Sequence, residues 1–180
     1  MKKQLKNTPI SLSIAVIMVI IFLLYNMNII KSLPCKKNIP NIFMNTFTHI
    51  DNKHLIANLL TLWALSRVEK DMGFTPFLWL LVFLVVFNTL VEYFIIKFYK
   101  DVDCGIGFSG ILFGIMTWEI ITKNDVSTEI ILTIAILTAT PSLNRKNISL
   151  ISHIIGALSG IVSGLLWKTI NNKAINKIEI

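Results

Sequence analysis

Charged residues are scarce in this 180-residue chain, in which they make up 15% of the sequence against 54% hydrophobic residues. Soluble domains carry about 25% charged residues, and one soluble core cannot bury this much apolar surface. The scarcity argues against a soluble domain and favours a membrane protein. Among the charged residues, acidic ones are fewer than basic ones, with 10 Asp and Glu and 17 Lys and Arg. The basic residues fall between apolar runs, so we expect membrane lipids as partners and no nucleic acid.

Cysteine is nearly absent. The two cysteines, Cys35 and Cys104, lie in predicted loops and form neither a CxxC pair nor the spacing of a zinc site. We expect free thiols. A disulfide is the alternative if both loops face an oxidising compartment.

Long apolar runs are abundant instead. Six are predicted to be membrane helices, at residues 10–30, 54–68, 74–99, 106–122, 127–143 and 148–167. A bilayer core needs about 20 helical residues, so the second, fourth and fifth runs are near the short limit. The first run is too long for the apolar region of a signal peptide, and no cleavage site follows it. We interpret it as an uncleaved helix.

The chain contains no second domain, no repeat of fixed period and no low-complexity tract. The sequence predicts one all-α membrane domain over residues 1–180, with a core at about 8–168 and a polar tail at 169–180. We expect the tail to fray or to lie on the membrane surface. Basic residues divide almost evenly between the two sides of a six-helix serpentine. The opening MKK favours a cytoplasmic N-terminus, and nothing indicates an oligomeric state.

Polar residues gather near the starts of the second, fourth and sixth predicted helices, which begin on the same face of the membrane in a serpentine chain. His54 and Asn58 share one helix face, Ser109 begins the fourth helix, and His153 lies early in the sixth. Polar groups at membrane depth face the bundle interior or a water-filled cavity. A serine becomes a nucleophile when an adjacent base takes its proton, so Ser109 and His153 are candidates. A histidine that only links helices by hydrogen bonds is the alternative for His153.

Small residues would bring the fourth and sixth predicted helices together. The glycines at helical spacing are Gly110, Gly114, Gly156, Gly160 and Gly164. Such spacing lets two helix backbones approach closely, which would place Ser109 within hydrogen-bonding range of His153. Plain helix packing explains the same pattern, so the glycines alone do not indicate chemistry.

Three groups could stabilise the oxyanion that forms during acyl transfer. They are the backbone N–H of Ser109 near a helix N-terminus, the side-chain amide of Asn58 and the ring of His54. Each such donor is worth about 3 kcal/mol in the transition state. No acidic residue lies near His153 in the sequence, so a dyad is favoured over a Ser-His-Asp triad.

These residues resemble the rhomboid family of intramembrane serine proteases. GFSG at 107–110 resembles the family's GxSG motif, and HIDNKHLIAN at 49–58 is similar to its second-helix pattern of two histidines and an asparagine. SHIIGALSG at 152–160 resembles its sixth-helix pattern, and VEKDMG at 68–73 is similar to the segment that leaves the second helix. The resemblance spans about residues 43–165.

The resemblance implies a bundle of six transmembrane helices that cleaves other membrane proteins within or beside their transmembrane helices. It implies Ser109 as nucleophile and His153 as general base, with His54, Asn58 and the Ser109 amide in the oxyanion hole. Transmembrane-helix proteins would be the substrates, at a site that opens to the outer side of the cell membrane. No metal and no cofactor are implied.

The resemblance also implies supporting roles. His49 would hold the loop before the second helix, and Gly107 would lie where the substrate backbone approaches. The other supporting positions in the matched motifs are Gly110, Phe113, Gly156 and Gly160.

Two positions depart from the family pattern. The loop before the second helix often carries a Trp-Arg pair, and this chain has Pro40 and Asn41 there. The residue four after the serine is often tyrosine and is Phe113 here, so the ring that would pack on the base is kept and the hydroxyl is lost. Neither departure removes a group expected to be catalytic.

Two other functions are open. A catalytically silent rhomboid-like protein could hold membrane clients, although all four expected catalytic and oxyanion side chains are present. A small transporter or metal carrier could use His49, Asp51, His54 and His153 as ligands. Against it, His49 and His54 are five residues apart and do not share a helix face.

Three acidic residues receive structural interpretations. Glu69 is predicted to be a loop acid beside Arg67, and Glu119 a charge at the inner end of a helix. Glu92 is placed near the outer end of the third helix, away from the histidines.

Overall fold

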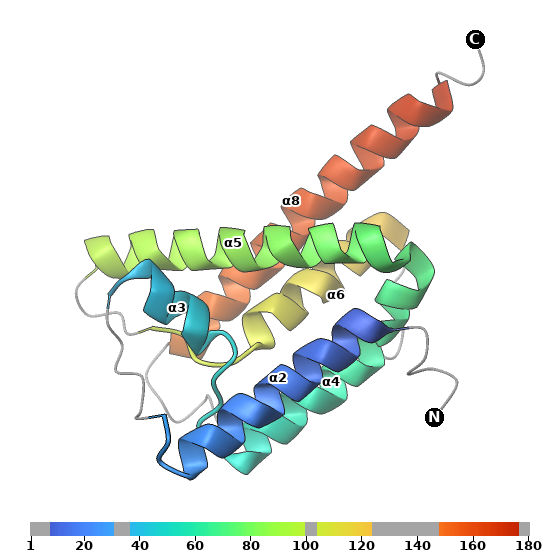
Figure 1. The fold of residues 1–180 in the computed structure, drawn as a ribbon. Coiled ribbons are helices and arrows are strands. Elements are labelled where there is room, and N and C mark those ends of the chain that lie inside the picture. Colours follow the sequence, from blue (N-terminus) through green and yellow to red (C-terminus); the bar gives the residue numbers. More distant parts are fainter. Residues whose placement is uncertain (1–7, 31–36, 100–103, 124–147, 177–180) are drawn as a thin grey trace.

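The computed structural model describes residues 8–30, 37–99, 104–123 and 148–176. These residues contain six α-helices and no strands, which confirms the predicted all-α class for this part of the chain (Figure 1). The helices are α2 (Pro9–Asn26), α3 (Ile39–Asn45), α4 (Asn52–Met72), α5 (Phe74–Phe98), α6 (Ser109–Lys123) and α8 (Ile148–Asn176). The fifth predicted span, 127–143, lies outside the described residues.

Three of the described helices are long and apolar enough to cross a membrane, at Pro9–Asn26, Phe74–Phe98 and Leu150–Asn171. Helix α6 has only 15 residues. Helix α4 has 21 residues but ends in the charged run RVEKDM. The described structure thus supports a membrane protein with three candidate spans, and the predicted number of six is not confirmed by the described residues.

Several helix boundaries differ from the prediction. Helix α4 begins at Asn52, where Asp51 caps it by accepting the His54 N–H at 2.8 Å, and it continues to Met72 rather than ending near residue 68. Helix α6 begins at Ser109 rather than at 106, because Gly107 has φ +106 and interrupts the helical backbone. Helix α8 runs to Asn176, so the tail from 169, predicted to fray or to lie on the membrane surface, is helical that far.

Glu69 explains why α4 does not end at its charged run. Its carboxylate accepts the backbone N–H groups of Ile10 and Ser11, each at 2.8 Å, and the Ser11 hydroxyl at 2.6 Å. The first N–H groups of a helix have no partner inside the helix and favour a negative charge. The interpretation of Glu69 as a loop acid is wrong, since this residue is 1% exposed and anchors the start of α2 to α4.

An ion-pair network joins the ends of α4 and α6. Arg67 pairs with Glu119 at 3.1 Å, and Lys123 pairs with Glu119 at 2.9 Å and with Asp71 at 2.8 Å. Glu119 lies near the end of α6, as predicted, and is 3% exposed, so this charge is buried and paired. Because the C-terminal ends of α4 and α6 meet here, the two helices run in the same direction and also begin at one common end.

The α6–α8 interface is the most extensive one among the described helices. A Cβ atom at Gly156 would overlap the Gly110 carbonyl, and one at Gly160 would overlap the Gly114 carbonyl. Thr117 adds a hydrogen bond across the interface to the carbonyl oxygen of Ala157 at 2.9 Å. The glycines therefore bring the two backbones into direct contact, as their spacing predicts.

The segment before α4, predicted to be a loop, contains the short helix α3. Asn38 caps it by accepting the Asn41 N–H at 3.0 Å, and Pro40 lies in its first turn, where a missing N–H costs nothing. Ile42 of α3 packs in a small core with Cys104, which is 2% exposed. Cys104 is disulfide-bonded, so the expectation of a free thiol is wrong for this residue. The other cysteine, Cys35, lies outside the described residues.

Candidate active site

Ser109 and His153 meet at the common end of α6 and α8. The Nε2 atom of His153 lies 2.8 Å from the Ser109 Oγ. Ser109 is the first residue of α6 and is 6% exposed, and His153 lies in the second turn of α8. A hydroxyl and an imidazole nitrogen at this distance can exchange a proton, which is the first requirement for an activated serine.

Phe113 supports the histidine ring. It follows Ser109 by one helical turn on α6, and its ring centroid lies 4.4 Å from that of His153 with an interplanar angle of 31°. The phenyl ring thus limits the positions that the imidazole can take. The aromatic contact expected at this position is present without a hydroxyl group.

The turn before Ser109 can be formed only by glycine at position 107. Gly107 has φ +106, and a Cβ atom there would lie 2.5 Å from Cε1 of His54. Its N–H donates to the carbonyl oxygen of Asn45 at 2.9 Å. The turn is therefore held between the end of α3 and the first turns of α4, with the His54 ring lying against it.

Asn58 lies one turn after His54 on α4 and is 1% exposed. Its Nδ2 donates to the backbone carbonyl of His54 at 2.9 Å. An amide nitrogen carries two protons, so this bond leaves one of them for a further acceptor. The structure gives no direct hydrogen bond from Asn58 or His54 to Ser109 among the described residues.

His49 is fully buried in the loop before α4, and its ring centroid lies 5.0 Å from that of His54. Burial, with a further contribution from the neighbouring His54, lowers the pKa of His49 to about 4, so it is neutral at pH 7. Asp51 is engaged as the cap of α4. Within the described ranges, no group of three or more His, Cys, Asp or Glu side chains is arranged to hold a metal ion.

His49 predicts a loss of stability in acid. An unfolded histidine titrates near pH 6.5 and the folded His49 near 4, so the unfolded state binds more protons as the pH falls through this window. This difference lowers the free energy of unfolding of the protein by up to about 3 kcal/mol by pH 4. We expect the melting temperature in detergent to fall less between pH 7.5 and pH 5 in His49→Gln than in the native chain. Equal falls in both proteins would contradict this interpretation.

Glu92 is a residue of the site that the sequence did not associate with the histidines. It lies near the C-terminal end of α5 and is 9% exposed. It accepts the backbone N–H of Gly105 and, at 3.4 Å, the hydroxyl of Ser152. The available signal was a single carboxylate in the otherwise apolar run of residues 74–99, since such groups in membrane helices are costly.

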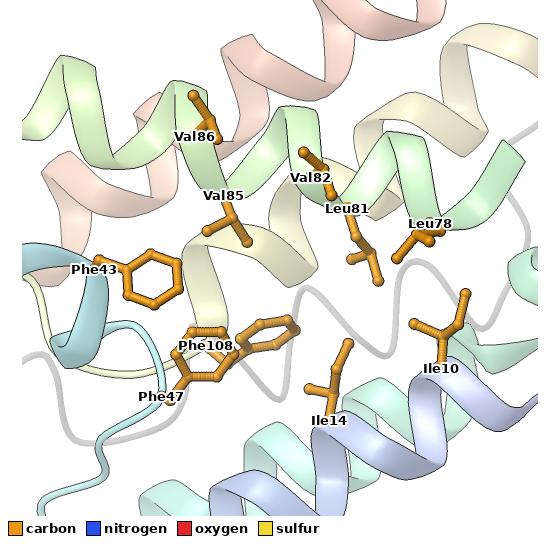
Figure 2. Close-up of a pocket in the computed structure, with 10 residues that line it drawn as sticks. All are labelled: Ile10, Ile14, Phe43, Phe47, Leu78, Leu81, Val82, Val85, Val86 and Phe108. Atoms are coloured by element: carbon orange, nitrogen blue, oxygen red, sulfur yellow. The ribbon is translucent and has the colours of Figure 1, made fainter. Parts of the chain in front are cut away.

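An apolar cavity of about 280 Å³ borders the site on another side. Figure 2 shows side chains of α2 and α5 facing Phe43, Phe47 and Phe108 across it. Phe108 directly precedes Ser109 and is fully buried. The ten lining residues in the described part of the chain are all apolar, so they offer no group for acid-base chemistry and do not include Ser109 or His153.

The fold and the site define a class, namely helical membrane proteins in which a serine and a histidine meet across two tightly packed helices. A family model described as Rhomboid domain matches residues 36–169, and the chain belongs to the rhomboid family. A protein of Acanthamoeba polyphaga mimivirus that is named as a rhomboid protein is 25% identical over 143 residues, covering 78% of this chain and 82% of its own length. The family is one of intramembrane proteases, generally serine proteases, and its members are integral membrane proteins.

Proposed function

We propose that this protein is an intramembrane serine endopeptidase that cleaves transmembrane-helix substrates with a Ser109–His153 dyad. The observation that carries the proposal is the 2.8 Å separation of Ser109 Oγ and His153 Nε2. The chain belongs to a family of intramembrane proteases, which agrees with it. A catalytically silent client-binding protein would not need this pair.

The reaction follows from the two side chains. His153 Nε2 accepts the Ser109 proton while Oγ attacks the scissile carbonyl carbon, which gives a tetrahedral intermediate. The protonated His153 then donates that proton to the leaving amine, and the peptide bond breaks to leave an acyl-enzyme. A water molecule, deprotonated by His153, attacks the ester, and Ser109 is released with its proton restored.

Negative charge on the carbonyl oxygen needs donors at the start of α6. The Ser109 backbone N–H has no helical partner because it is the first residue of the helix. The second Nδ2 proton of Asn58 and the His54 ring are the other proposed donors; the His54 ring lies against Gly107, and Asn58 follows one turn later on α4. Loss of one donor of this kind typically lowers kcat by about 10²–10³.

A helical substrate hides its carbonyl groups in backbone hydrogen bonds, so it must unwind locally before attack. We therefore propose a preference for small residues near the cleaved bond and for helix-breaking residues beyond it. Cleavage rates over a panel of single-span substrates that vary these positions would measure the preference. A panel without any such bias would refute it.

The proposed arrangement has six membrane helices, a cytoplasmic N-terminus and an active site that opens to the outer side of the cell membrane. The state of Cys104 supports the orientation. This disulfide-bonded residue lies one position before Gly105, in the segment that leads into Ser109. Disulfides persist in oxidising compartments and are rare in the cytosol, which supports the proposal that the site end of the bundle faces outward.

The direct test is cleavage of a model single-span substrate in liposomes that contain the purified protein. We expect the native chain to cleave it and Ser109→Ala to leave it intact, because the variant lacks the oxygen proposed to form the acyl-enzyme. Equal cleavage by both proteins would point to a contaminating protease and contradict the proposal. Substrate retention by the native chain without cleavage would favour a silent binding protein.

A further inference from the structure

The Glu92 carboxylate contacts both chain segments that lead into the proposed dyad. One oxygen accepts the N–H of Gly105, which precedes Ser109 by four residues, and the other accepts the hydroxyl of Ser152, which directly precedes His153. One side chain on α5 thus connects the loop before α6 to the start of α8.

This junction has no spare room. A Cβ atom at Gly105 would overlap the Ser152 hydroxyl and lie 3.0 Å from Glu92 Oε1. In the first turn of α6, a Cβ atom at Gly110 would lie 2.9 Å from the carbonyl oxygen of Ser152. The loop, α5 and α8 are therefore in direct contact at the level of Ser109, and displacement of one of them displaces the others.

A carboxylate is a costly choice for this position if packing is its only purpose. Glu92 takes part in none of the ion pairs of the described residues, whereas Glu119 pairs with two cations and Glu69 accepts three hydrogen bonds at a helix start. Burying such a group is unfavourable unless hydrogen bonds offset the cost, and those of Glu92 go to the two segments that lead into the dyad.

We propose that Glu92 is a positioning residue for the Ser109–His153 pair. Its carboxylate holds the loop at Gly105 against the first turns of α8, and thereby keeps Ser109 Oγ and His153 Nε2 at their 2.8 Å separation. It does not touch the reacting atoms. The inference rests on the proposed protease function, because the effect of Glu92 is measured as a change in the catalytic rate of that dyad.

The experiment compares the native chain with Glu92→Ala, Glu92→Gln and Ser152→Ala, purified in detergent, by kcat and KM for one single-span substrate. Misplacing reacting groups by about 1 Å costs on the order of 10²-fold in rate. We expect Glu92→Ala to lower kcat by about 10- to 100-fold with KM within about 2-fold, because substrate binding does not involve this carboxylate. Glu92→Gln should recover most of kcat, since its amide oxygen can accept the Gly105 N–H. Ser152→Ala removes one of the two contacts and should show an intermediate loss.

Glu69→Gln is the matched control. It alters a second buried carboxylate that accepts backbone N–H groups, at the opposite end of α4 from the site. We expect it to lower the melting temperature and to leave kcat per folded molecule unchanged. If Glu92→Ala lowers only the melting temperature, as the control does, Glu92 is merely structural and the inference is overturned.

The two proposals fail in different ways. If Glu92→Ala does not fold, Ser152→Ala still decides, because a kcat equal to that of the native chain overturns the inference. If the native protein is active and the Glu92 and Ser152 variants have the same kcat as the native chain, only the positioning role is contradicted. An inactive native chain that also fails to react with a fluorophosphonate contradicts the protease function itself.

Discussion

Replacing His153 with alanine is expected to lower kcat/KM for a single-span substrate by about 10⁴-fold, because the change removes the base that lies within hydrogen-bonding distance of the Ser109 hydroxyl. General bases contribute about 10²–10⁴ in rate, and loss of a nucleophile's partner falls at the upper end of this range. The measurement is the initial rate in proteoliposomes, normalised to folded protein.

A double variant sharpens this prediction. Residues that act as one catalytic unit are strongly non-additive, so Ser109→Ala combined with His153→Ala should be no slower than the slower single variant. Multiplied losses in the double variant would show that the two residues act independently. A His153→Ala protein that keeps more than a tenth of the native rate would remove His153 from its proposed role.

Replacing Gly156 with alanine is expected to have the second large effect, through helix packing. The added Cβ would overlap the Gly110 carbonyl, and backbone cannot move aside as a flexible side chain can. The start of α8 must then separate from α6, which lengthens the Ser109–His153 contact. We expect a loss of about 10²-fold or more in kcat, together with a destabilisation of about 1–3 kcal/mol from overpacking.

Gly164→Ala is the matched control on the same helix. The Cβ added there would meet the Ile121 side chain at 2.9 Å, two turns further from His153 than Gly156 is. We expect a smaller loss of kcat than for Gly156→Ala, with both variants compared for melting temperature and rate. A larger loss at Gly164 would contradict the view that the interface positions the dyad from its Gly156 end.

The sequence predicts those parts of the site that depend on local pattern. The glycines of the fourth and sixth predicted helices predict that these helices pack closely. Helices α6 and α8 do so, with Ser109 and His153 in contact. The direction of a serpentine chain places the starts of alternate helices at one end, and the pairing of Arg67 with Glu119 at the far end agrees with this. The family resemblance is carried by the same residues, and the Rhomboid domain match confirms it.

The acidic residues could not be placed from the sequence, because their partners lie far along the chain. Glu69 and its hydrogen-bond partner Ser11 are 58 residues apart, and Glu92 and Ser152 are 60 apart. Hydropathy indicates that such a residue is unusual in its run but not which backbone groups will meet it. Helix α4 extends through its charged run for this reason, since Glu69 is satisfied by the start of α2 rather than by water.

The Gly107 turn and α3 illustrate a second limit. Apolar periodicity indicates where a helix can continue, so the fourth helix was predicted from 106, whereas the positive φ of Gly107 delays it to Ser109. Short helices such as α3 carry little periodic signal, and its cap at Asn38 is a local polar contact. The functional consequence is considerable, because starting α6 at Ser109 is what leaves its backbone N–H free of a helical partner.

The most direct test of the central claim is to treat the native protein in membranes with a fluorophosphonate and to map the adduct by mass spectrometry. The serine oxygen displaces fluoride from phosphorus, so the adduct marks the nucleophile. We predict an adduct on Ser109 in the native chain and none in His153→Ala, which retains the serine but lacks its base. An adduct on Ser152 instead, or equal labelling of both proteins, would contradict the assignment of the Ser109–His153 pair.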